Sequence, residues 1–577
     1  MHKKLTILNL FGCQNLTSLP SKFEMECLKE LNLRWCSKIT EIPEFGRNMK
    51  CVSSLYLNGT AITTLPTSIE HLTDLVELEL YNCKNLVHFP DTIFNLKLVR
   101  RVNLWGCSKL DRLPENLGNA ESLISFELSE TAIRKVPSSI GLLKHLDELT
   151  IIGCEGLSSN KLWYELLPFD SMPTSPDPMD LLFSSLSLLG ASFLTQLDLC
   201  YCNLKAISND IGSLFSLEIL NLSGNDFVCL PESIIRLSNL TWMGLNNCTS
   251  PRSLPKLPLN IVEVEAEGCI SLEMLPDPFK PSNSLEASLY LLNCFQLADN
   301  QSCMHRFISG IKKSLKLSPS LPPSYYNGYN FLGSYNIVIP GSEIPEWFSY
   351  QSMWKEVKIR QPSHLYKKVG IAFCFVFCTL LDKTSYDLCS LMANGKRMYI
   401  GHHSITDTVL SSDHLCVVYV TPQFFYKGPN KLLWEGDTNG FSQIIIKIEA
   451  NDLSLKVKKW GFRMIYKKDI EDLDRKMFQS GNSSITPYDG MDVLHHNLDN
   501  SSVVVECHKV KRSHDDYNEA RPSKEGSSND IPNPKGIKRH TETHGNSDSK
   551  DCDEELCDWD NSNDDSEEDN DDSEEDN

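Results

Sequence analysis

The sequence predicts an α/β solenoid shaped as a horseshoe, then an all-β sandwich of the jelly-roll kind, then a disordered acidic C-terminal tail. Three observations carry this prediction. A leucine-spaced motif recurs through the first half of the chain, short apolar runs alternate with turn signals after residue 336, and the last segment is dominated by Asp and Glu. These features are typical of a repeat array, an antiparallel β domain and an unfolded tail, respectively.

The motif LxxLxLxxC defines the first domain, residues 1–277. It reads "LTILNLFGC" at 5–13, "LKELNLRWC" at 28–36 and "LVELELYNC" at 75–83, and eleven such units begin between Leu5 and Ile261. The alternating LxL core predicts a short strand with its leucines turned inward, and stacked units then form a parallel sheet on the concave side. This is the signature of leucine-rich repeats. Because the cysteine recurs at one fixed position, we expect buried free thiols rather than disulfides.

Two stretches interrupt or follow the repeats. The step from Leu146 to Leu194 spans two periods but holds one recognisable unit, and its middle is rich in Pro, Asp and Ser. Residues 158–192 are therefore predicted to be a loop insertion, either a tolerated one or a binding loop. Residues 278–331, which become rich in proline, are predicted to be a linker.

Variable positions of the repeats carry aromatic and arginine side chains. Phe11, Tyr81 and Trp105 share one column, directly after the last strand leucine. Aromatic and arginine side chains on a rigid face are typical of protein-binding hot spots, although the alternative is that some pack along the sheet against their neighbours. The predicted partner-binding residues on the concave face are Phe11, Trp35, Tyr81, Arg100, Arg101, Trp105, Tyr201 and Trp242.

Residues 332–470 are predicted to form the β-sandwich, with runs such as "VGIAFCFVFC" and "SLKVKKWGFRMIY" as strands. Near the start of this domain, "PGSEIPEWF" combines turn residues with two aromatic anchors. We expect this motif to fix the entry of the chain into the domain rather than to form a functional site. Its structural residues are Pro340, Gly341, Ser342, Glu343, Ile344, Pro345, Trp347 and Phe348.

Residues 471–577 are polar and are predicted to be disordered. Segment 551–577 holds sixteen Asp and Glu and no Lys or Arg, so most of the net charge of −21 lies there and the folded part is close to neutral. A near-neutral fold does not favour direct nucleic-acid binding, which needs a basic face. Within the repeated "DDSEEDN", Ser566 and Ser573 precede acidic residues and are candidate phosphorylation sites, unless the tail is simply a solvated duplication.

The sequence predicts a binding protein and not an enzyme. No run of about 18 apolar residues occurs, so no membrane span is predicted. The adjacent histidine pairs lack Cys or acidic partners at ligand spacing, and no GxxxxGK[ST] phosphate loop is present. We expect no catalytic residues, no metal and no cofactor.

Repeats followed by "NCFQL", "IPGSEIPEWFSYQS" and "VKKWGFRMIYKKD" resemble the C-terminal half of plant TIR-NB-ARC-LRR immune receptors. The second domain is similar to their post-LRR jelly-roll, the C-JID domain. This resemblance implies a cytoplasmic module that recognises a pathogen effector protein through the concave face and the C-JID domain. The family's NAD-cleaving TIR domain and nucleotide-binding NB-ARC switch match no residues here.

Two other functions stay open. One is a truncated, signalling-incompetent regulator or decoy that binds full-length TIR-NB-ARC-LRR receptors or their ligands; the other is a glycan-binding jelly-roll. Only "MHKK" precedes the first repeat, which is too short to cap a solenoid, so we expect another domain at this end or a fragment. Basic tracts at 509–512 and 535–539 would also permit nuclear import, so the predicted location is cytoplasmic or nucleo-cytoplasmic.

Overall fold

The structure is a computed structural model, and it describes the repeats and the strands that follow them. The acidic segment and both candidate phosphorylation sites, Ser566 and Ser573, lie outside the described residues. The described residues are 4–157, 178–188, 193–275, 287–297, 334–353, 356–362, 368–379, 389–393, 396–400, 412–420, 435–436, 441–449, 455–466 and 504–506.

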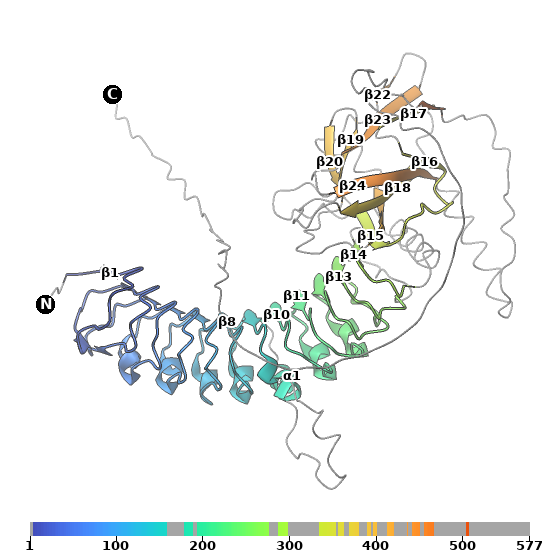
Figure 1. The fold of residues 1–577 in the computed structure, drawn as a ribbon. Helices are drawn as coiled ribbons and strands as arrows, with labels where there is room; N and C mark the ends of the chain where they lie inside the picture. Colours follow the sequence, from blue (N-terminus) through green and yellow to red (C-terminus); the bar gives the residue numbers. More distant parts are fainter. Residues whose placement is uncertain are drawn as a thin grey trace, which may run out of the picture. The chain divides into compact units, whose positions relative to one another are not determined.

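Short parallel strands, one in each repeat, form the sheet of the solenoid (Figure 1). The register sets each inward apolar residue beside its counterpart in the next repeat, as Leu31 pairs with Leu55 and Leu55 with Leu78. All three are fully buried, because alternation along the strand turns every second side chain into the core. The strands are β1 Ile7–Asn9, β3 Glu30–Asn32, β5 Ser54–Tyr56, β6 Glu77–Glu79, β7 Arg101–Asn103, β8 Ser125–Glu127, β9 Glu148–Thr150, β10 Gln196–Asp198, β11 Ile219–Asn221, β12 Trp242–Gly244, β13 Glu263–Glu265 and β14 Ala287–Tyr290.

Short 3-10 helices line the side of the curved array opposite the strands (Figure 1). Four of them follow a proline of the recurring Leu-Pro or Phe-Pro or Val-Pro pair, namely Pro66, Pro90, Pro137 and Pro231. Proline suits this position because its φ is fixed and it has no N–H to leave unpaired. The helices are η1 Thr67–His71, η2 Asp91–Asn95, η3 Leu117–Asn119, η4 Ser138–Leu142, η5 Glu155–Leu157, η8 Asn209–Ser213 and η9 Glu232–Arg236; β2 Lys22–Phe23 and β4 Glu44–Phe45 pair in the first repeats.

The recurring cysteine of the motif donates a hydrogen bond to the repeat before it. Cys83 Sγ, for example, donates to the Leu57 carbonyl oxygen at 3.2 Å. Where Asn225 takes the same position, its Nδ2 donates to the Leu199 carbonyl oxygen at 2.8 Å. These buried donors satisfy carbonyls that no strand partner reaches. The cysteines that donate in this way are Cys36, Cys83, Cys107, Cys154, Cys202, Cys248, Cys269 and Cys294.

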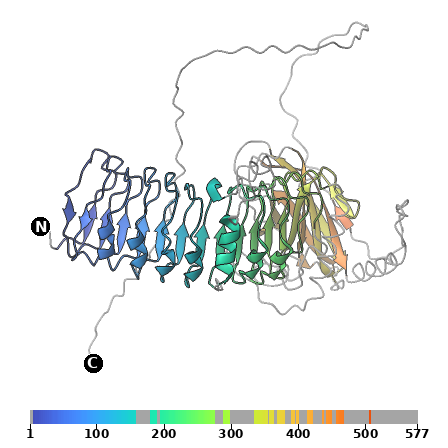
Figure 2. The ribbon, with the colours of Figure 1, turned by 90° about the horizontal axis from the view of Figure 1, so that it is seen from below.

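A helix occupies the last part of the predicted loop insertion. The prediction of a loop for the whole of 158–192 is wrong for α1, Pro178–Leu188, which lies between η4 and η8 in line with the short helices (Figure 2). Strand β9 pairs directly with β10 across the interval, so the helix replaces an outer turn and adds no strand. Its apolar residues follow helical spacing, a signal that the Pro- and Ser-rich residues before it obscured. The buried ones are Met179, Leu182, Phe183 and Leu186.

The parallel sheet continues beyond the eleven repeats counted from the motif. The prediction of a linker for the whole of 278–331 is wrong for β14, whose Leu289 continues the buried column of the repeats. Strand β14 pairs in parallel with β13, and it pairs again with β15, Ser334–Pro340. Strand β15 then pairs antiparallel with β21, so the sheet of the repeats runs directly into the sheet of the second domain. The order from β14 onward is β15, β21 His414–Val420, β18 Lys368–Thr379, β24 Leu455–Tyr466 and β16 Tyr350–Ser352.

A second antiparallel sheet completes the described strands of this domain. Strands therefore occur where the apolar runs predicted them, while the jelly-roll connectivity stays a prediction. One strand, β25 Val504–Glu506, pairs with β17 inside the segment predicted to be disordered, where three consecutive valines favour extended backbone. The sheet holds β17 Glu356–Pro362, β19 Cys389–Ala393, β20 Lys396–Ile400, β22 Glu435–Gly436, β23 Phe441–Glu449 and β25.

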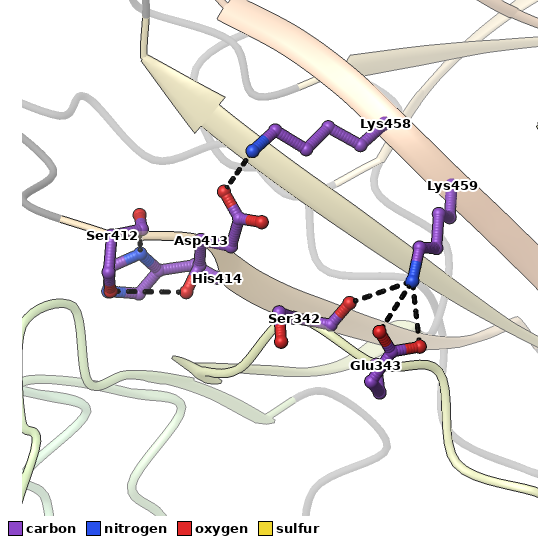
Figure 3. Close-up of polar contacts among 7 residues, drawn as sticks. All are labelled: Ser342, Glu343, Ser412, Asp413, His414, Lys458 and Lys459. Atoms are coloured by element: carbon purple, nitrogen blue, oxygen red, sulfur yellow. Dashed lines mark hydrogen bonds and ion pairs between the residues drawn. The ribbon is translucent and has the colours of Figure 1, made fainter. Parts of the chain in front are cut away.

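A buried histidine joins the last repeat to the second domain. His414, at the start of β21, is fully buried, and its Nε2 accepts a hydrogen bond from the Asn293 backbone N–H at 2.9 Å. Its Nδ1 therefore carries the proton and donates to the Ser412 carbonyl oxygen at 3.0 Å (Figure 3). Phe295 and Phe377 pack against the ring. Burial lowers the pKa of His414 to about 4, so the ring is neutral in the folded chain.

We expect the folded chain to lose stability in mild acid because of His414. Between about pH 6.5 and 4 the unfolded chain binds a proton that the buried ring refuses, so stability falls by up to about 3 kcal/mol as the pH drops through this window. Thermal unfolding between pH 7 and 4.5 measures the loss. His414→Gln keeps an acceptor but cannot titrate, so its melting temperature should depend less on pH. The exposed His88→Gln is the control, and equal slopes in all three proteins would contradict the assignment.

Candidate partner-binding surface

Each strand of the repeats is followed by one residue with left-handed backbone. Glycine and other residues alternate at this position along the array, as in Trp35 with φ 61°, Gly59 with φ 66° and Asn82 with φ 60°. Glycine adopts this backbone at no steric cost, whereas another residue loses about 1–2 kcal/mol. The complete series is Gly12, Trp35, Gly59, Asn82, Gly106, Glu130, Gly153, Tyr201, Gly224, Asn247, Gly268 and Asn293.

Because glycine alternates with larger residues at the left-handed position, each large side chain can lie over the glycine of the next repeat. Trp35 covers Gly59 of the next repeat, where a Cβ would clash with the indole, and its ring meets Tyr81 of the repeat after that. Tyr201 repeats this arrangement: it covers Gly224, and its hydroxyl accepts a hydrogen bond from Asn247 Nδ2 at 3.4 Å. Each aromatic side chain therefore spans one whole repeat.

Three rings form a continuous set, here called the aromatic ladder: Trp35, Tyr81 and Trp105. The centroids of Trp35 and Tyr81 lie 6.1 Å apart at an interplanar angle of 81°, and those of Tyr81 and Trp105 lie 5.6 Å apart at 86°. These are edge-to-face contacts, which fix the rings relative to one another. Trp35 and Trp105 remain 37% and 40% exposed. The ladder is thus an ordered apolar surface open to solvent.

The eight predicted residues fall in four columns of the repeat. The structure brings three of them into the aromatic ladder, while Phe11 (59% exposed) and Tyr201 (52% exposed) lie in other repeats. Trp242 is half-buried, and its Nε1 donates to Glu265 Oε1 at 3.4 Å. Arg100 lies directly before a strand, and Arg101 and Trp242 are first residues of strands. Phe11, Tyr81 and Trp105 lie directly before the left-handed residue, and Trp35 and Tyr201 are themselves left-handed residues.

Acidic and polar side chains, which sequence reasoning missed, lie on the strands beside the aromatic ladder. Arg34 stacks on the Tyr56 ring, with Cζ 3.8 Å from the centroid, and the Tyr56 hydroxyl donates to Glu77 Oε2 at 2.9 Å. Arg101 Nη1 lies 3.9 Å from Glu77 Oε1. Burial and the nearby Glu77 raise the pKa of Glu79 to about 7, against the opposing effect of Arg34. The "ExE" pattern that recurs on the strands was the sequence signal that could have revealed these acidic side chains.

The same acidic pattern occurs near the end of the repeats. Glu263 and Glu265 take the same two strand positions as Glu77 and Glu79. Burial and the charge of Glu265 raise the pKa of Glu263. Asn246 Nδ2 donates to Glu265 Oε2 at 2.9 Å. Carboxylates held with raised pKa on an outward-facing strand position are a frequent feature of functional surfaces.

The PGSEIPEWF motif is held by ionic and hydrogen bonds to β24 and to Asp413, the residue directly before β21. Lys459 Nζ lies 2.7 Å from both carboxylate oxygens of Glu343 and 3.3 Å from the Ser342 carbonyl oxygen (Figure 3). Lys458 Nζ lies 2.6 Å from Asp413 Oδ1 in the same view. The Gly341 N–H donates to the Asp413 carbonyl oxygen at 3.0 Å. These contacts tie the motif to two strands far away in sequence.

The aromatic residues of the motif are anchors in the structure. Phe348 and Ile344 are buried, and Trp347 meets Phe348 edge-to-face with centroids 5.0 Å apart. Arg463 Nη1 donates to the Trp347 carbonyl oxygen at 2.8 Å, and its guanidinium lies over the indole at 5.1 Å. The motif therefore packs into the domain, and its residues serve the fold.

Models of protein families match three parts of the chain. The C-JID domain matches residues 339–471. The leucine-rich repeats of RPS4B-like disease resistance proteins match residues 24–112, and a general leucine-rich repeat matches residues 216–237. The chain carries the leucine-rich repeats and the C-JID domain of plant disease resistance proteins.

Individual disease resistance proteins are also similar to this chain. Disease resistance-like protein DSC1 of Arabidopsis thaliana is 33% identical over 62% of this chain and 30% of its own length. TMV resistance protein N of Nicotiana glutinosa is 29% identical over 81% of this chain and 38% of its own length. The chain thus spans well under half of these relatives. Among solved structures, a leucine-rich-repeat protein of Leptospira interrogans is 21% identical over 49% of this chain and 85% of its own, with a TM-score of 0.27.

The described part of the chain offers neither of two other kinds of site. No three or more His, Cys, Asp or Glu side chains gather there in a way that could hold a metal ion. None of its described helices combines the length and the apolar character that a membrane crossing needs.

Replacing Gly59 with alanine should destabilise the fold more than the left-handed backbone alone would, because the new Cβ also disturbs the aromatic ladder. Alanine at a left-handed position costs about 1 kcal/mol, and the clash with Trp35 should raise the total to about 2–3 kcal/mol. Gly153→Ala is the matched control, because its φ is 68° and its Cβ would meet only Glu130 Cγ, at 3.6 Å. Urea unfolding of both variants gives the comparison; equal losses would mean that Trp35 moves aside freely.

Replacing Glu79 with glutamine should stabilise the chain in mild alkali but not in acid. Because the pKa of Glu79 is raised to about 7, folding favours the protonated carboxyl, and that advantage is lost as the pH rises from 4.5 through 7. Glutamine resembles the protonated form at every pH. The melting temperature of Glu79→Gln should therefore exceed that of the wild type at pH 8 and equal it at pH 4.5. The exposed Glu41→Gln should show no such difference.

Proposed function

We propose that the chain is the recognition part of an intracellular plant immune receptor and that it binds a pathogen effector protein on the aromatic ladder. One observation carries the proposal: Trp35 and Tyr201 keep exposed aromatic side chains on left-handed backbone. Asparagine, which tolerates this backbone far better, holds the equivalent position at Asn82, Asn247 and Asn293. Strained residues of this kind gather where a protein uses them rather than where it only folds.

The chemistry of the surface indicates the kind of partner. Aromatic rings fixed by edge-to-face contacts lose little entropy on binding and are the usual anchors of protein interfaces. Beside them, Glu77 and Glu79 hold carboxyl groups in a partly desolvated place, and the raised pKa of Glu79 reflects that cost. A lysine or arginine of the partner would restore the charged carboxylate. We therefore infer an effector surface in which a basic side chain adjoins an apolar one.

The comparisons support a role in plant defence, and the C-JID domain supports a composite surface. Hydrogen bonds between β14 and β15 and between Asn293 and His414 hold this domain to the last repeat. A partner on the repeats near that junction, such as the repeat of β12 that carries Trp242, would then contact a fixed neighbouring domain rather than a tethered one. This arrangement would let both domains contribute to recognition.

Binding to a panel of secreted pathogen effectors, measured pairwise with the purified chain, tests the proposal. We expect Tyr81→Ala and Trp105→Ala each to weaken a detected interaction at least tenfold, because each removes a ring of the aromatic ladder. Phe215→Ala is the matched control, since Phe215 is 57% exposed and precedes the strands instead of following them. The melting temperatures of all variants should stay close to that of the wild type.

The outcomes separate the competing functions. Unchanged affinity in both ladder variants would place the effector site elsewhere. Binding of the chain to a full-length TIR-NB-ARC-LRR receptor, with no effector bound, would favour the regulator. Retention on a glycan array that survives both ladder substitutions would favour a carbohydrate site in the C-JID domain.

A further inference from the structure

Two cysteines occupy the same turn in successive repeats. Cys27 lies in the turn before β3, and Cys51 lies in the turn before β5. Each precedes the first residue of its strand by three positions, and those first residues, Glu30 and Ser54, are paired in the parallel sheet. The register therefore places Cys27 beside Cys51.

Side chains at this position do touch between neighbouring repeats. His145 and Phe193 hold the same place before β9 and β10, which pair through Glu148 and Gln196, and their rings lie 5.7 Å apart. Neighbouring strands of a sheet are about 4.8 Å apart, which falls within the Cα separation of about 4.4–6.8 Å that a disulfide requires. A bond between Cys27 and Cys51 thus needs side-chain rotation and no rearrangement of the repeats.

These two thiols differ from those of the cysteine column. Both are exposed and free, whereas cysteines such as Cys83 are buried and donate to a carbonyl of the preceding repeat. Burial also raises the pKa of the column thiols, to about 12 for Cys202 and Cys248, and this keeps them protonated and unreactive. An oxidant in solution would therefore reach the exposed pair and leave the buried column cysteines, Cys36 to Cys294, intact.

We propose that Cys27 and Cys51 form a redox-sensitive dithiol that a hydroperoxide converts to a disulfide. One thiolate attacks the peroxide, whose O–O bond breaks, giving a sulfenic acid and, with hydrogen peroxide, one water after protonation. The second thiol then attacks the sulfenic sulfur, the S–O bond breaks, and a second water leaves as the S–S bond forms. Two thiols lose two electrons and two protons in total, and one peroxide is reduced to two waters.

The bond would fix the spacing of the repeats that support one end of the aromatic ladder. Trp35 belongs to the repeat of β3, and Gly59, which it covers, belongs to the repeat of β5. A covalent link between these two repeats restrains the unfolded chain and limits local opening of the repeats. Oxidation should therefore protect this part of the sheet, while reduction by a thiol should release it.

Peptide mapping of the oxidised chain tests the proposal directly. The full chain is treated with hydrogen peroxide, alkylated without reductant, and digested with trypsin. We expect peptide 23–29 to be joined to peptide 51–84, and the link to disappear after dithiothreitol. Because the second peptide also contains the buried Cys83, the Cys51→Ser variant decides which sulfur is bonded.

Three variants complete the design. The link should be absent from Cys27→Ser and from Cys51→Ser, and it should persist in Cys229→Ser, which removes an exposed cysteine elsewhere. Oxidation should slow amide hydrogen exchange in β3 and β5 of the wild type and of Cys229→Ser. It should leave the exchange unchanged in Cys27→Ser and in Cys51→Ser. Peptide 23–29 recovered only in alkylated or sulfinic form would overturn the proposal. A link that survives in Cys51→Ser would overturn it as well.

Discussion

From the second repeat onward the chain leaves the sheet through a left-handed turn, and the next residue points a hydrogen-bond donor into the core. Asn82 and Cys83 illustrate the pair: the first has φ 60°, and the second donates to the Leu57 carbonyl oxygen. The Leu57 carbonyl oxygen also accepts from the N–H and the hydroxyl of Thr60 in its own repeat, so the Cys83 thiol adds a bond between neighbouring repeats to a carbonyl that is already paired. This step turns the chain away from the sheet toward the outer side, and its buried donors bond neighbouring repeats together.

The turn also determines where aromatic side chains can lie. Each non-glycine residue at this position points its side chain along the array, so its counterpart in the next repeat must leave room. Gly59 does so for Trp35, and Gly224 does so for Tyr201. The structural repeat at the surface is consequently two units long, although the core repeats with every unit. One constraint on the backbone thus organises both the interior and the exposed surface.

The sequence predicted what is local and periodic, and missed what depends on distant contacts. The LxxLxLxxC motif predicted the strands because its leucines alternate, but β14 escaped it because Glu286 stands where the motif needs an apolar residue. The alternation of glycine at the left-handed position is visible in the sequence, yet the contact of Trp35 with Tyr81 requires the register of three repeats. The bond of Asn293 to His414 joins residues 121 positions apart, and no local pattern signals it.

Acidic strands recur with aromatic side chains in both halves of the array. Glu77 and Glu79 lie on β6 beside the aromatic ladder, and Glu263 with Glu265 takes the same positions in the half that carries Tyr201. A fold selected for stability alone would place neutral residues there, since burial disfavours the charged carboxylate. In both halves of the array, carboxyl groups with raised pKa accompany an aromatic side chain on strained backbone. The recurrence of this costly combination is the reason for proposing a partner that brings apolar and basic groups together.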